Sequence, residues 1–388
     1  RRQRQMCIRD RLYSIPDYYK EFSCTADQCE DTCCAGWQIV VDRKALNRYR
    51  HVSGVFKKEL RRGIDWKEGT FRQSTEKRCA FLDEDNLCRM YKKLGEKSLC
   101  RTCRLYPRHI EEFENVREIT LSVSCPEVAK LLLEKEEPVR FLSYEKEGEE
   151  TYEEFDYLLY SMLADAREVM IGIAQNRDKP LGERILLVLG LAHDIERRVR
   201  SGNLFTCEEL FDKYESEAAG KFVHGRLAHY IQQEERRYKE GKRLFRKLYR
   251  LEVLKEDWRR VLQESELLLY KEGGKAYSEN CRRYEQWMNE KIPDWQVKCE
   301  QLFVYFLYTY FCGAVYDARV YGKVQMAAVS VLLISELWKA RWLRNEGVLD
   351  LEDLTEIVYR YSRELEHSDE NLELFEMMME KTKIPVKK

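Results

Sequence analysis

Apolar residues recur at helical spacing from about residue 139 to the end of the chain. In the segment 180–200, for example, Ile185, Val188, Leu189, Ala192 and Ile195 fall on one face of a helix. The same spacing holds for Tyr152, Phe155, Leu159, Met162 and Leu163. It predicts further helices near 204–219, 222–247, 251–271, 277–290, 295–316, 321–345 and 350–384. Gly273 and Gly274 predict a break, and Pro180 a helix start. The pattern therefore predicts a helical domain over residues 139–388.

Residues 12–138 follow no such period. Short apolar pieces alternate with turns there, and only a few elements can be predicted. One is a helix over Asp42–Arg62 with Asp42 as its N-cap. A turn at 83–86 would bring Cys79 and Cys88 together, and a short helix begins at Pro126 and ends near Pro138. We expect a mainly α protein, with an irregular cysteine-rich N-terminal segment packed on a multi-helix body.

The first residues, RRQRQMCIRDR, stand apart from this pattern. They carry a basic run without the apolar stretch of a secretory signal. The string MCIRDR also looks like translated sequencing-adapter sequence. We expect residues 1–11 to be non-native or a disordered basic arm, and leave Cys7 out of the functional argument.

Charge and hydropathy exclude two classes of protein. The chain has 68 Lys and Arg against 69 Asp and Glu, a net charge of −1, which argues against nucleic-acid binding through bulk positive charge. We find no run of about 18 apolar residues, so we expect no transmembrane segment. The most apolar stretch, 302–315, is short and rich in Tyr, and predicts a buried helix.

Cysteine usage changes the picture of the N-terminal segment. Ten of the 14 cysteines lie in residues 1–125. Small secreted domains use cysteines as disulfides, but this chain is long and its cysteines are clustered, which favours bound metal in a cytoplasmic protein.

The cysteine spacing narrows the choice of metal to zinc or an iron–sulfur cluster, without deciding between them. The cysteines that could be ligands number more than one four-ligand site needs, so either two sites exist or some thiols are structural. Cys33 and Cys34 are adjacent and would point to opposite sides of an extended strand, which favours a role for them in different sites. The candidate metal ligands are Cys24, Cys29, Cys33, Cys34, Cys79, Cys88, Cys100, Cys103 and Cys125.

Four segments carry a resemblance to a known family. CEDTCCAGW, RCAFLDEDNLC, LGEKSLCRTCRLYPR and SCPEVA occur in this order, and together they resemble the flagellin lysine N-methylase family. The likeness is strong over residues 12–138, and weaker in the helical remainder. It implies an S-adenosylmethionine-dependent enzyme that methylates lysine on flagellin and uses a [4Fe–4S] cluster.

Two motifs of other methyl-donor enzymes are missing. A CxxxCxxC triad would need a cysteine where Gly36 stands, and there is no GxGxxG-like loop after a strand. The donor must therefore bind in another way. One hypothesis is that its amino and carboxylate groups bind an open iron.

Other side chains are candidates for catalysis and donor binding. Lysine methylation needs a neutral amine, which a base or an apolar aromatic pocket would favour. Tyr361, Glu366 and His367 near the end of the chain are the candidate catalytic residues, although each has core or structural alternatives. Arg101, Arg104 and Arg108 flank Cys103, and are candidates either for binding the cofactor or for ordinary surface charge.

The sequence thus predicts a protein-lysine N-methyltransferase with flagellin as partner and with zinc as the alternative metal. The rival hypothesis is a non-catalytic zinc- or iron-binding module whose helical body docks a partner protein. The order of the cysteines does not decide which of them bind the cluster, and an oligomer remains open.

Overall fold

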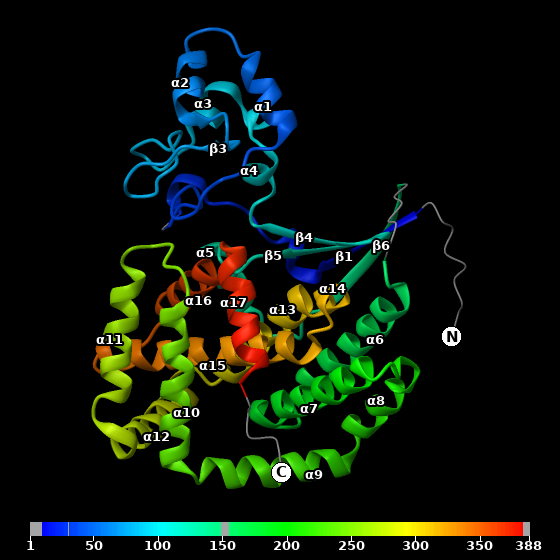
Figure 1. The fold of residues 1–388 in the computed structure, drawn as a ribbon. Helices are drawn as coiled ribbons and strands as arrows, with labels where there is room; N and C mark the ends of the chain where they lie inside the picture. The colour runs from blue at the N-terminus through cyan, green and yellow to red at the C-terminus, as the bar shows by residue number, and fades with distance from the viewer. Residues whose placement is uncertain (1–9, 30, 149–154, 383–388) are drawn as a thin grey trace.

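The computed structural model describes residues 10–29, 31–148 and 155–382. It contains a small sheet, a helical body on one side of this sheet, and a separate lobe on the other (Figure 1). Helices dominate, so the predicted mainly α class is confirmed. Residues 1–9 and Tyr152 lie outside the described residues. Asp10 and Arg11, predicted to be non-native or disordered, already belong to the first strand.

A four-stranded sheet was missed. Its order is β4 (Arg108–Phe113), β5 (Val116–Leu121), β1 (Asp10–Pro16) and β6 (Phe141–Glu147). Strands β4, β5 and most of β1 lie in the segment predicted to be irregular, and β6 lies at the start of the segment predicted to be helical, where that prediction is wrong. The first strand pairs in parallel with β5 and antiparallel with β6. These strands are short and contain charged residues that the fold buries, such as Arg117 and Glu118 of β5. The alternation that marks a half-buried strand is therefore absent from β5.

The lobe holds residues 34–103 and has its own small core, and we call it the Cys-rich lobe. Its helices are α1 (Arg43–Arg50), α2 (Phe56–Gly63), α3 (Arg89–Leu94) and α4 (Arg101–Leu105), with a hairpin of β2 (Ile64–Asp65) and β3 (Thr70–Phe71). Asp42 caps α1 as predicted, accepting a hydrogen bond from the Ala45 backbone N–H at 2.9 Å. The single helix predicted over 42–62 is wrong, because Gly54 adopts φ +83° and separates α1 from α2.

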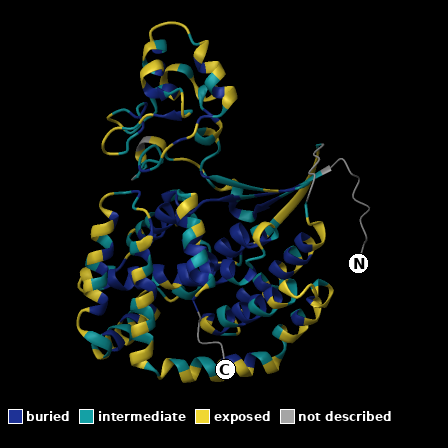
Figure 2. Ribbon diagram, in the orientation of Figure 1, coloured by how far each residue is buried: buried dark blue, intermediate teal, exposed yellow. Residues whose placement is uncertain are grey.

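The helical body forms around α13 (Trp295–Tyr310) and α15 (Val320–Arg344), whose side chains are almost all buried (Figure 2). The other helices of the body are α6 (Tyr157–Ala174), α7 (Leu181–Arg200), α8 (Glu208–Glu215), α9 (Glu217–Ile231), α10 (Glu234–Phe245), α11 (Trp258–Tyr270), α12 (Gly273–Lys291), α14 (Ala314–Asp317), α16 (Leu351–Glu366) and α17 (Asp369–Glu380). The start of α7 after Pro180 and the break at Gly273 are confirmed. The predicted helices 222–247 and 350–384 are each divided in two, at Gln232–Gln233 and at His367–Ser368.

The core of the body continues into the sheet. It includes β5 and also α5 (Pro126–Glu134), which begins at Pro126 as predicted. Arg167 of α6 forms a buried ion pair with Glu118 of β5, and the Tyr308 hydroxyl of α13 donates to Ser14 Oγ of β1 at 2.5 Å. The sheet and α5 thus pack with the helices, although the sequence grouped β4, β5, α5 and most of β1 with the cysteines.

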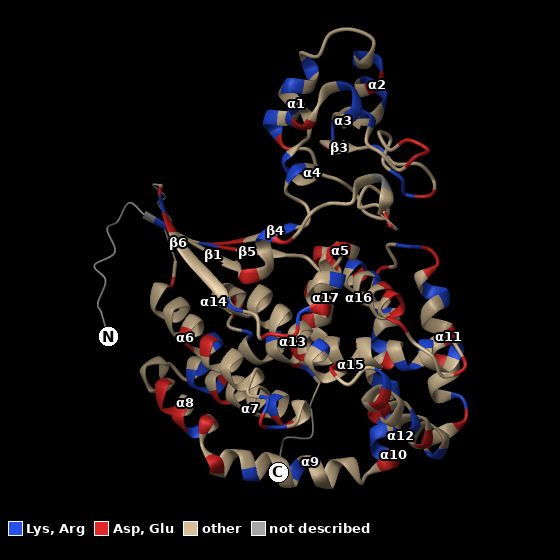
Figure 3. Ribbon diagram, turned by 180° about the vertical axis from the view of Figure 1, so that it is seen from behind, with Lys and Arg blue, Asp and Glu red and all other residues tan. Residues whose placement is uncertain are grey.

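Surface charge is mixed, in keeping with the net charge of −1. Lys and Arg gather on α1 and α2 of the Cys-rich lobe, whereas Asp and Glu mark α8 of the body (Figure 3).

Within the described residues, one helix, α15, has the length and composition of a membrane span. It was not identified from the sequence, because the sequence of α15 contains charged residues between its apolar ones. However, 83% of its most apolar window is buried inside the protein. A core helix of a globular protein passes the same test, and α15 occupies that position.

Candidate functional site

Five cysteines lie together in the Cys-rich lobe, and we call them the lobe thiols: Cys34, Cys79, Cys88, Cys100 and Cys103. Cys79 and Cys100 are part of the lobe core, and the other three pack against it. The Cys79 backbone N–H donates to the Cys34 carbonyl at 2.9 Å. Burial raises the pKa of Cys79 to about 12, with added repulsion from Cys34 and Cys88. The turn predicted at 83–86 lies between Cys79 and Cys88, and the effect of the Cys88 charge on the pKa of Cys79 indicates that the two thiols are near each other.

Four other cysteines gather between the lobe and the body, and we call them the junction thiols: Cys24, Cys29, Cys33 and Cys125. Burial raises the pKa of Cys125 to about 11, and the charge of Cys29 raises it further. The pKa of Cys33 is raised chiefly by its hydrogen bond with Cys34, then by burial and by the charges that include Cys125 and Cys24. Since such repulsion falls with distance, these thiols are neighbours. The charges that act on Cys33 include those of the junction thiols Cys24 and Cys125, while Cys33 also hydrogen-bonds to Cys34 of the lobe, so that these two thiols link the two groups.

Two of the lobe thiols are shifted toward the thiolate form, which is the form that binds metals. The hydrogen bond from Cys33 lowers the pKa of Cys34 to about 7, with a further contribution from the Arg78 guanidinium. The hydrogen bond from Cys103 lowers the pKa of Cys100. All the cysteines that the structure describes are free thiols.

The donor chemistry of these thiols fits zinc or an iron–sulfur cluster. The thiols of each group lie near one another, but in the described part of the chain their sulfur atoms are not arranged as a coordination sphere. Within residues 10–29, 31–148 and 155–382, no three Cys, His, Asp or Glu side chains converge closely enough to hold a metal ion. Which of the nine thiols are ligands therefore stays a prediction.

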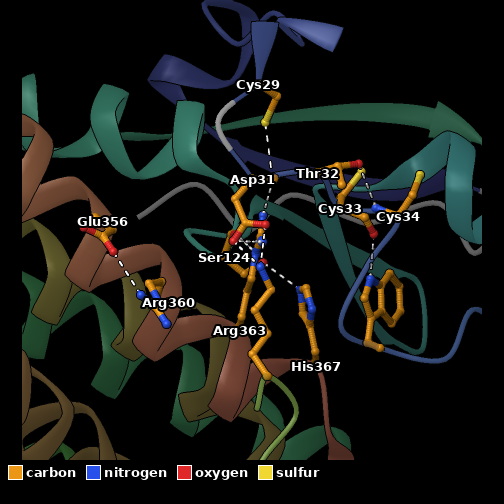
Figure 4. A network of polar contacts seen from close by, with 12 residues as sticks. Cys29, Asp31, Thr32, Cys33, Cys34, Ser124, Glu356, Arg360, Arg363 and His367 are labelled. Atoms are coloured by element: carbon orange, nitrogen blue, oxygen red, sulfur yellow. Dashed lines mark hydrogen bonds and ion pairs between the residues drawn. The ribbon is translucent and has the colours of Figure 1, made fainter. Parts of the chain in front are cut away.

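A partly buried ion cluster connects the segment of the junction thiols to the end of α16 (Figure 4). Arg363 pairs with the Asp31 carboxylate at 2.7 Å, and also donates to the backbone carbonyls of Asp31 and Ser124 at 2.7 and 2.8 Å. Lys255 Nζ binds the same carboxylate at 2.5 Å. Cys29 Sγ donates to the Asp31 carbonyl at 3.4 Å. Arg363 thereby connects the segments that carry Cys29 and Cys125.

Glu366 lies near this cluster, surrounded by hydroxyl groups. Its Oε2 accepts from Tyr305, Tyr310 and Ser122 at 2.5, 2.8 and 3.3 Å, and its Oε1 accepts from Ser362. Burial raises the pKa of Glu366. With four donors on one carboxylate, Glu366 is well placed to position the two tyrosines, and has little capacity left for an incoming group.

His367 is the C-cap residue of α16 and lies where the predicted helix 350–384 is divided in two. Its Nε2 lies 2.9 Å from Ser124 Oγ, and its ring contacts Trp37 with 4.8 Å between ring centroids. Burial, followed by the positive charge of Arg363, lowers the pKa of His367 to about 3. The imidazole is therefore neutral at physiological pH, and contacts residues on both sides of the junction.

The remaining candidates lie elsewhere. Tyr361 is buried in the body, where its hydroxyl donates to Ser330 Oγ at 3.0 Å. Arg101 is exposed and faces Glu112 at 3.7 Å, and Arg104 is also exposed. Arg108 packs over the Tyr19 ring and donates to its hydroxyl at 2.8 Å.

Sequence reasoning missed the charged residues that do contact the thiol-bearing segments, namely Asp31, Arg363 and Lys255. Asp31 lies two residues after Cys29, and Arg363 is one helical turn before Glu366 and His367. These spacings were visible signals. Lys255 and Arg363, however, are brought to Asp31 only by the fold, because they lie 224 and 332 residues away along the chain.

The fold and the site together define a mainly α protein with a thiol-rich lobe joined to its helices by a buried polar network. Residues 167–385 match the model of the FliB lysine N-methylase C-terminal domain, which is more than half of the chain. The chain belongs to the FliB lysine N-methylase family, a family of protein-lysine methyltransferases.

Curated relatives agree with this assignment. The chain is 32% identical over 127 residues to the flagellar biosynthetic protein FliU of Salmonella muenchen, which covers 30% of this chain and 75% of that protein. It is equally similar to the lysine-N-methylases of Salmonella typhimurium and Salmonella choleraesuis, but there the match covers only 31% of each relative. No solved structure matches the chain.

Proposed function

We propose that this protein is an S-adenosylmethionine-dependent protein-lysine N-methyltransferase that acts on flagellin and uses a cysteine-ligated [4Fe–4S] cluster. The match of residues 167–385 to a lysine N-methylase domain carries the proposal. The flagellar substrate is supported by the name of the FliU relative. The cluster is supported by the density and grouping of the thiols.

We write the reaction as a polar transfer of the methyl group from the sulfur atom of the donor to the nitrogen atom of lysine. The lone pair of a neutral lysine amine forms the new N–CH3 bond while the S–CH3 bond breaks. The bonding pair returns to sulfur, giving S-adenosylhomocysteine, and the amine proton leaves to solvent. Each transfer needs an amine that has lost its proton, so an apolar environment at the reacting lysine would favour the reaction.

The cluster ligands would come from the nine thiols of the two groups. When bound, a cluster supplies redox-active iron, and it supplies folding free energy to the segments that hold it. The junction thiols lie beside Arg363, which could balance the negative charge of a thiolate cluster. The lobe thiols suit a structural site, because they are part of a small core.

Glu366 and His367 act in this proposal as positioning residues. Glu366 holds Tyr305 and Tyr310, and His367 holds Ser124 against the lobe residue Trp37. Donor binding by Arg101, Arg104 and Arg108 stays a prediction. The free thiols favour a reducing compartment, so we propose that the protein is cytoplasmic.

Anaerobic purification followed by a transfer assay tests the proposal. We expect a brown protein that contains iron and sulfide and that transfers label from methyl-labelled S-adenosylmethionine to lysine in purified flagellin. Flagellin with its lysines blocked by acetylation is the control substrate. An intact cluster without label on lysine would refute the activity. A colourless protein with stoichiometric zinc would refute the cluster and favour the rival interaction module.

The ligand groups can be tested separately. Replacing Cys29 by Ser should reduce the metal bound at the junction, whereas Cys88→Ser should affect the lobe. Cys207→Ser, in the body away from both groups, is the control. Metal analysis and the visible absorption spectrum of each variant give the readout. If Cys29→Ser and Cys88→Ser leave the metal content and spectrum of the parent unchanged, both are excluded as ligands.

A further inference from the structure

The helical body contains a cavity that the site described above does not use. Its accessible volume is about 550 Å³, and it lies among α7, α9, α10, α12, α13 and α15. Ligand pockets in proteins span about 300–1,000 Å³. The cavity is therefore large enough for a nucleotide-sized molecule.

One wall of the cavity carries a buried charged cluster. Glu336 and Lys339 of α15 are only 4% and 6% exposed, and their side chains pair at 2.6 Å. Tyr270 and Tyr277 donate to the Glu336 carboxylate at 2.8 and 3.0 Å. Lys339 Nζ also lies 3.1 Å from Cys281 Sγ. The carboxylate thus accepts from three donors, and its pairing with Lys339 fixes the direction of the ammonium group.

Aromatic rings surround this cluster. Lys339 Nζ lies 4.9 Å from the centroid of the Tyr277 ring and 5.9 Å from that of Tyr284. Trp295 and Tyr230 also line the cavity. Aromatic faces bind flat heterocycles by stacking and attract organic cations. Because the Lys339 ammonium already lies over Tyr277 and Tyr284, the stacking property is the one left for a ligand, and it suits a purine.

The mouth of the cavity is apolar with a basic rim. Phe222, Ile231 and Leu332 are 60%, 50% and 42% exposed, although all three are large apolar residues. Arg237 and Arg243 add positive charge beside them. An apolar mouth would strip water from a lysine amine and favour its neutral form, and an arginine could bind a carboxylate.

The position of the cavity along the chain supports the same conclusion. All its lining residues lie between Pro180 and Thr382, inside the segment that matches the lysine N-methylase domain. The Cys-rich lobe lies outside this segment. The sequence also has no GxGxxG-like loop for the donor.

We propose that this cavity, and not an open iron among the thiols, binds the methyl donor S-adenosylmethionine. The inference rests on the proposed function and adds a place for the donor. Tyr284 and Trp295 would hold the purine, Lys339 would donate a hydrogen bond to the ligand, and the rim arginines would hold its carboxylate. The substrate lysine would enter through the apolar mouth.

Calorimetric binding of S-adenosylhomocysteine to the full-length holoprotein tests the assignment. Leu332→Trp should fill the mouth and weaken binding at least tenfold. Val348→Trp is the matched control, since Val348 is 61% exposed just after α15 and does not line the cavity. Equal affinity of the Leu332→Trp variant and the parent protein would overturn the proposal.

Photo-crosslinking of methyl-labelled S-adenosylmethionine to the unmodified protein gives an independent readout. Label on peptides from α12 or α15 is the expected result. Label on peptides that carry the junction or lobe thiols would place the donor at the metal and refute the cavity. In that case methyl transfer to flagellin would persist, whereas failure of the proposed function itself would remove both transfer and donor binding from the parent protein.

Discussion

Glu366 illustrates how much a single carboxylate can organise. It accepts hydrogen bonds from Tyr305 and Tyr310, both of which are buried on α13. A buried hydroxyl that loses its acceptor costs about 1–3 kcal/mol. Its place on a helix was predicted from the sequence, but the end of α16 at this residue and its two tyrosine partners on another helix were not.

We therefore predict that Glu366→Ala destabilises the protein by about 3 kcal/mol, since two buried hydroxyls lose their acceptor. Glu366→Gln keeps an acceptor and should cost about 1 kcal/mol, within the range of one hydrogen bond. Urea unfolding followed by circular dichroism measures both. Glu352→Ala, on an exposed position of the same helix, is the control. If all three variants were equally stable, the network would have no structural role.

The depressed pKa of His367 predicts that the stability of the protein depends on pH. Its pKa in the folded protein is about 3, below the ordinary value of 6.5, because of burial and the charge of Arg363. A group with a depressed folded pKa binds its proton more readily in the unfolded chain. Its contribution to stability is therefore complete above about pH 6.5, and is lost as the pH falls toward 3.

Replacing His367 by Gln should make the melting temperature fall less steeply between pH 6.5 and 4.5 than it does in the parent protein. The charges of Asp31 and Lys255, which also affect the pKa of His367, are unchanged in this variant. Thermal melts at several pH values give the measurement, and His51→Gln, at an exposed position, is the control. Identical slopes for the parent protein and the His367→Gln variant would contradict the assignment.

At the scale of elements, α16 joins the lobe to the body. Arg363 is buried, and it bonds to Asp31 and to the Ser124 carbonyl. Removing one partner of a buried ion pair leaves the other charge uncompensated. Lys255 alone would then hold the Asp31 carboxylate.

We predict that Arg363→Met loosens the segment 24–34 while the helices of the body stay protected. Hydrogen exchange should show at least tenfold faster exchange in that segment. Arg344→Met, which removes a side chain that is 57% exposed and in a 3.7 Å surface pair, should leave exchange there unchanged. Unaltered exchange in the Arg363→Met variant would show that the junction is held by other contacts.

At the scale of the whole molecule, the protein has two separate hydrophobic cores that differ in how they are stabilised. The body core runs from the sheet to α17, whereas the lobe core is small and contains cysteines. A small core supplies little stability by itself, and bound metal can supply the rest.

If the proposed metal is bound by the lobe thiols, removing it with a chelator under anaerobic conditions should therefore unfold the Cys-rich lobe first. Limited proteolysis should cut within residues 34–103 while a fragment containing α6 to α17 resists. The holoprotein, treated in parallel without chelator, is the control. Simultaneous cleavage of lobe and body would show that the two cores unfold as one.

The sequence by itself determined the helical class, most helices of the body, the N-cap at Asp42 and the family. These features depend on local spacing and on short motifs, which are readable without knowing the fold. It also predicted that Cys33 and Cys34 face different sites, because side chains of adjacent residues diverge.

Only the tertiary structure decided which groups meet. Strand β5 was missed because it is buried on both faces, and the sequence signal of alternation vanishes there. Arg363 reaches Asp31, and Glu336 meets Tyr270 and Tyr277, across long stretches of chain. Such contacts depend on how the helices pack, and packing is a property of the whole core rather than of any local pattern.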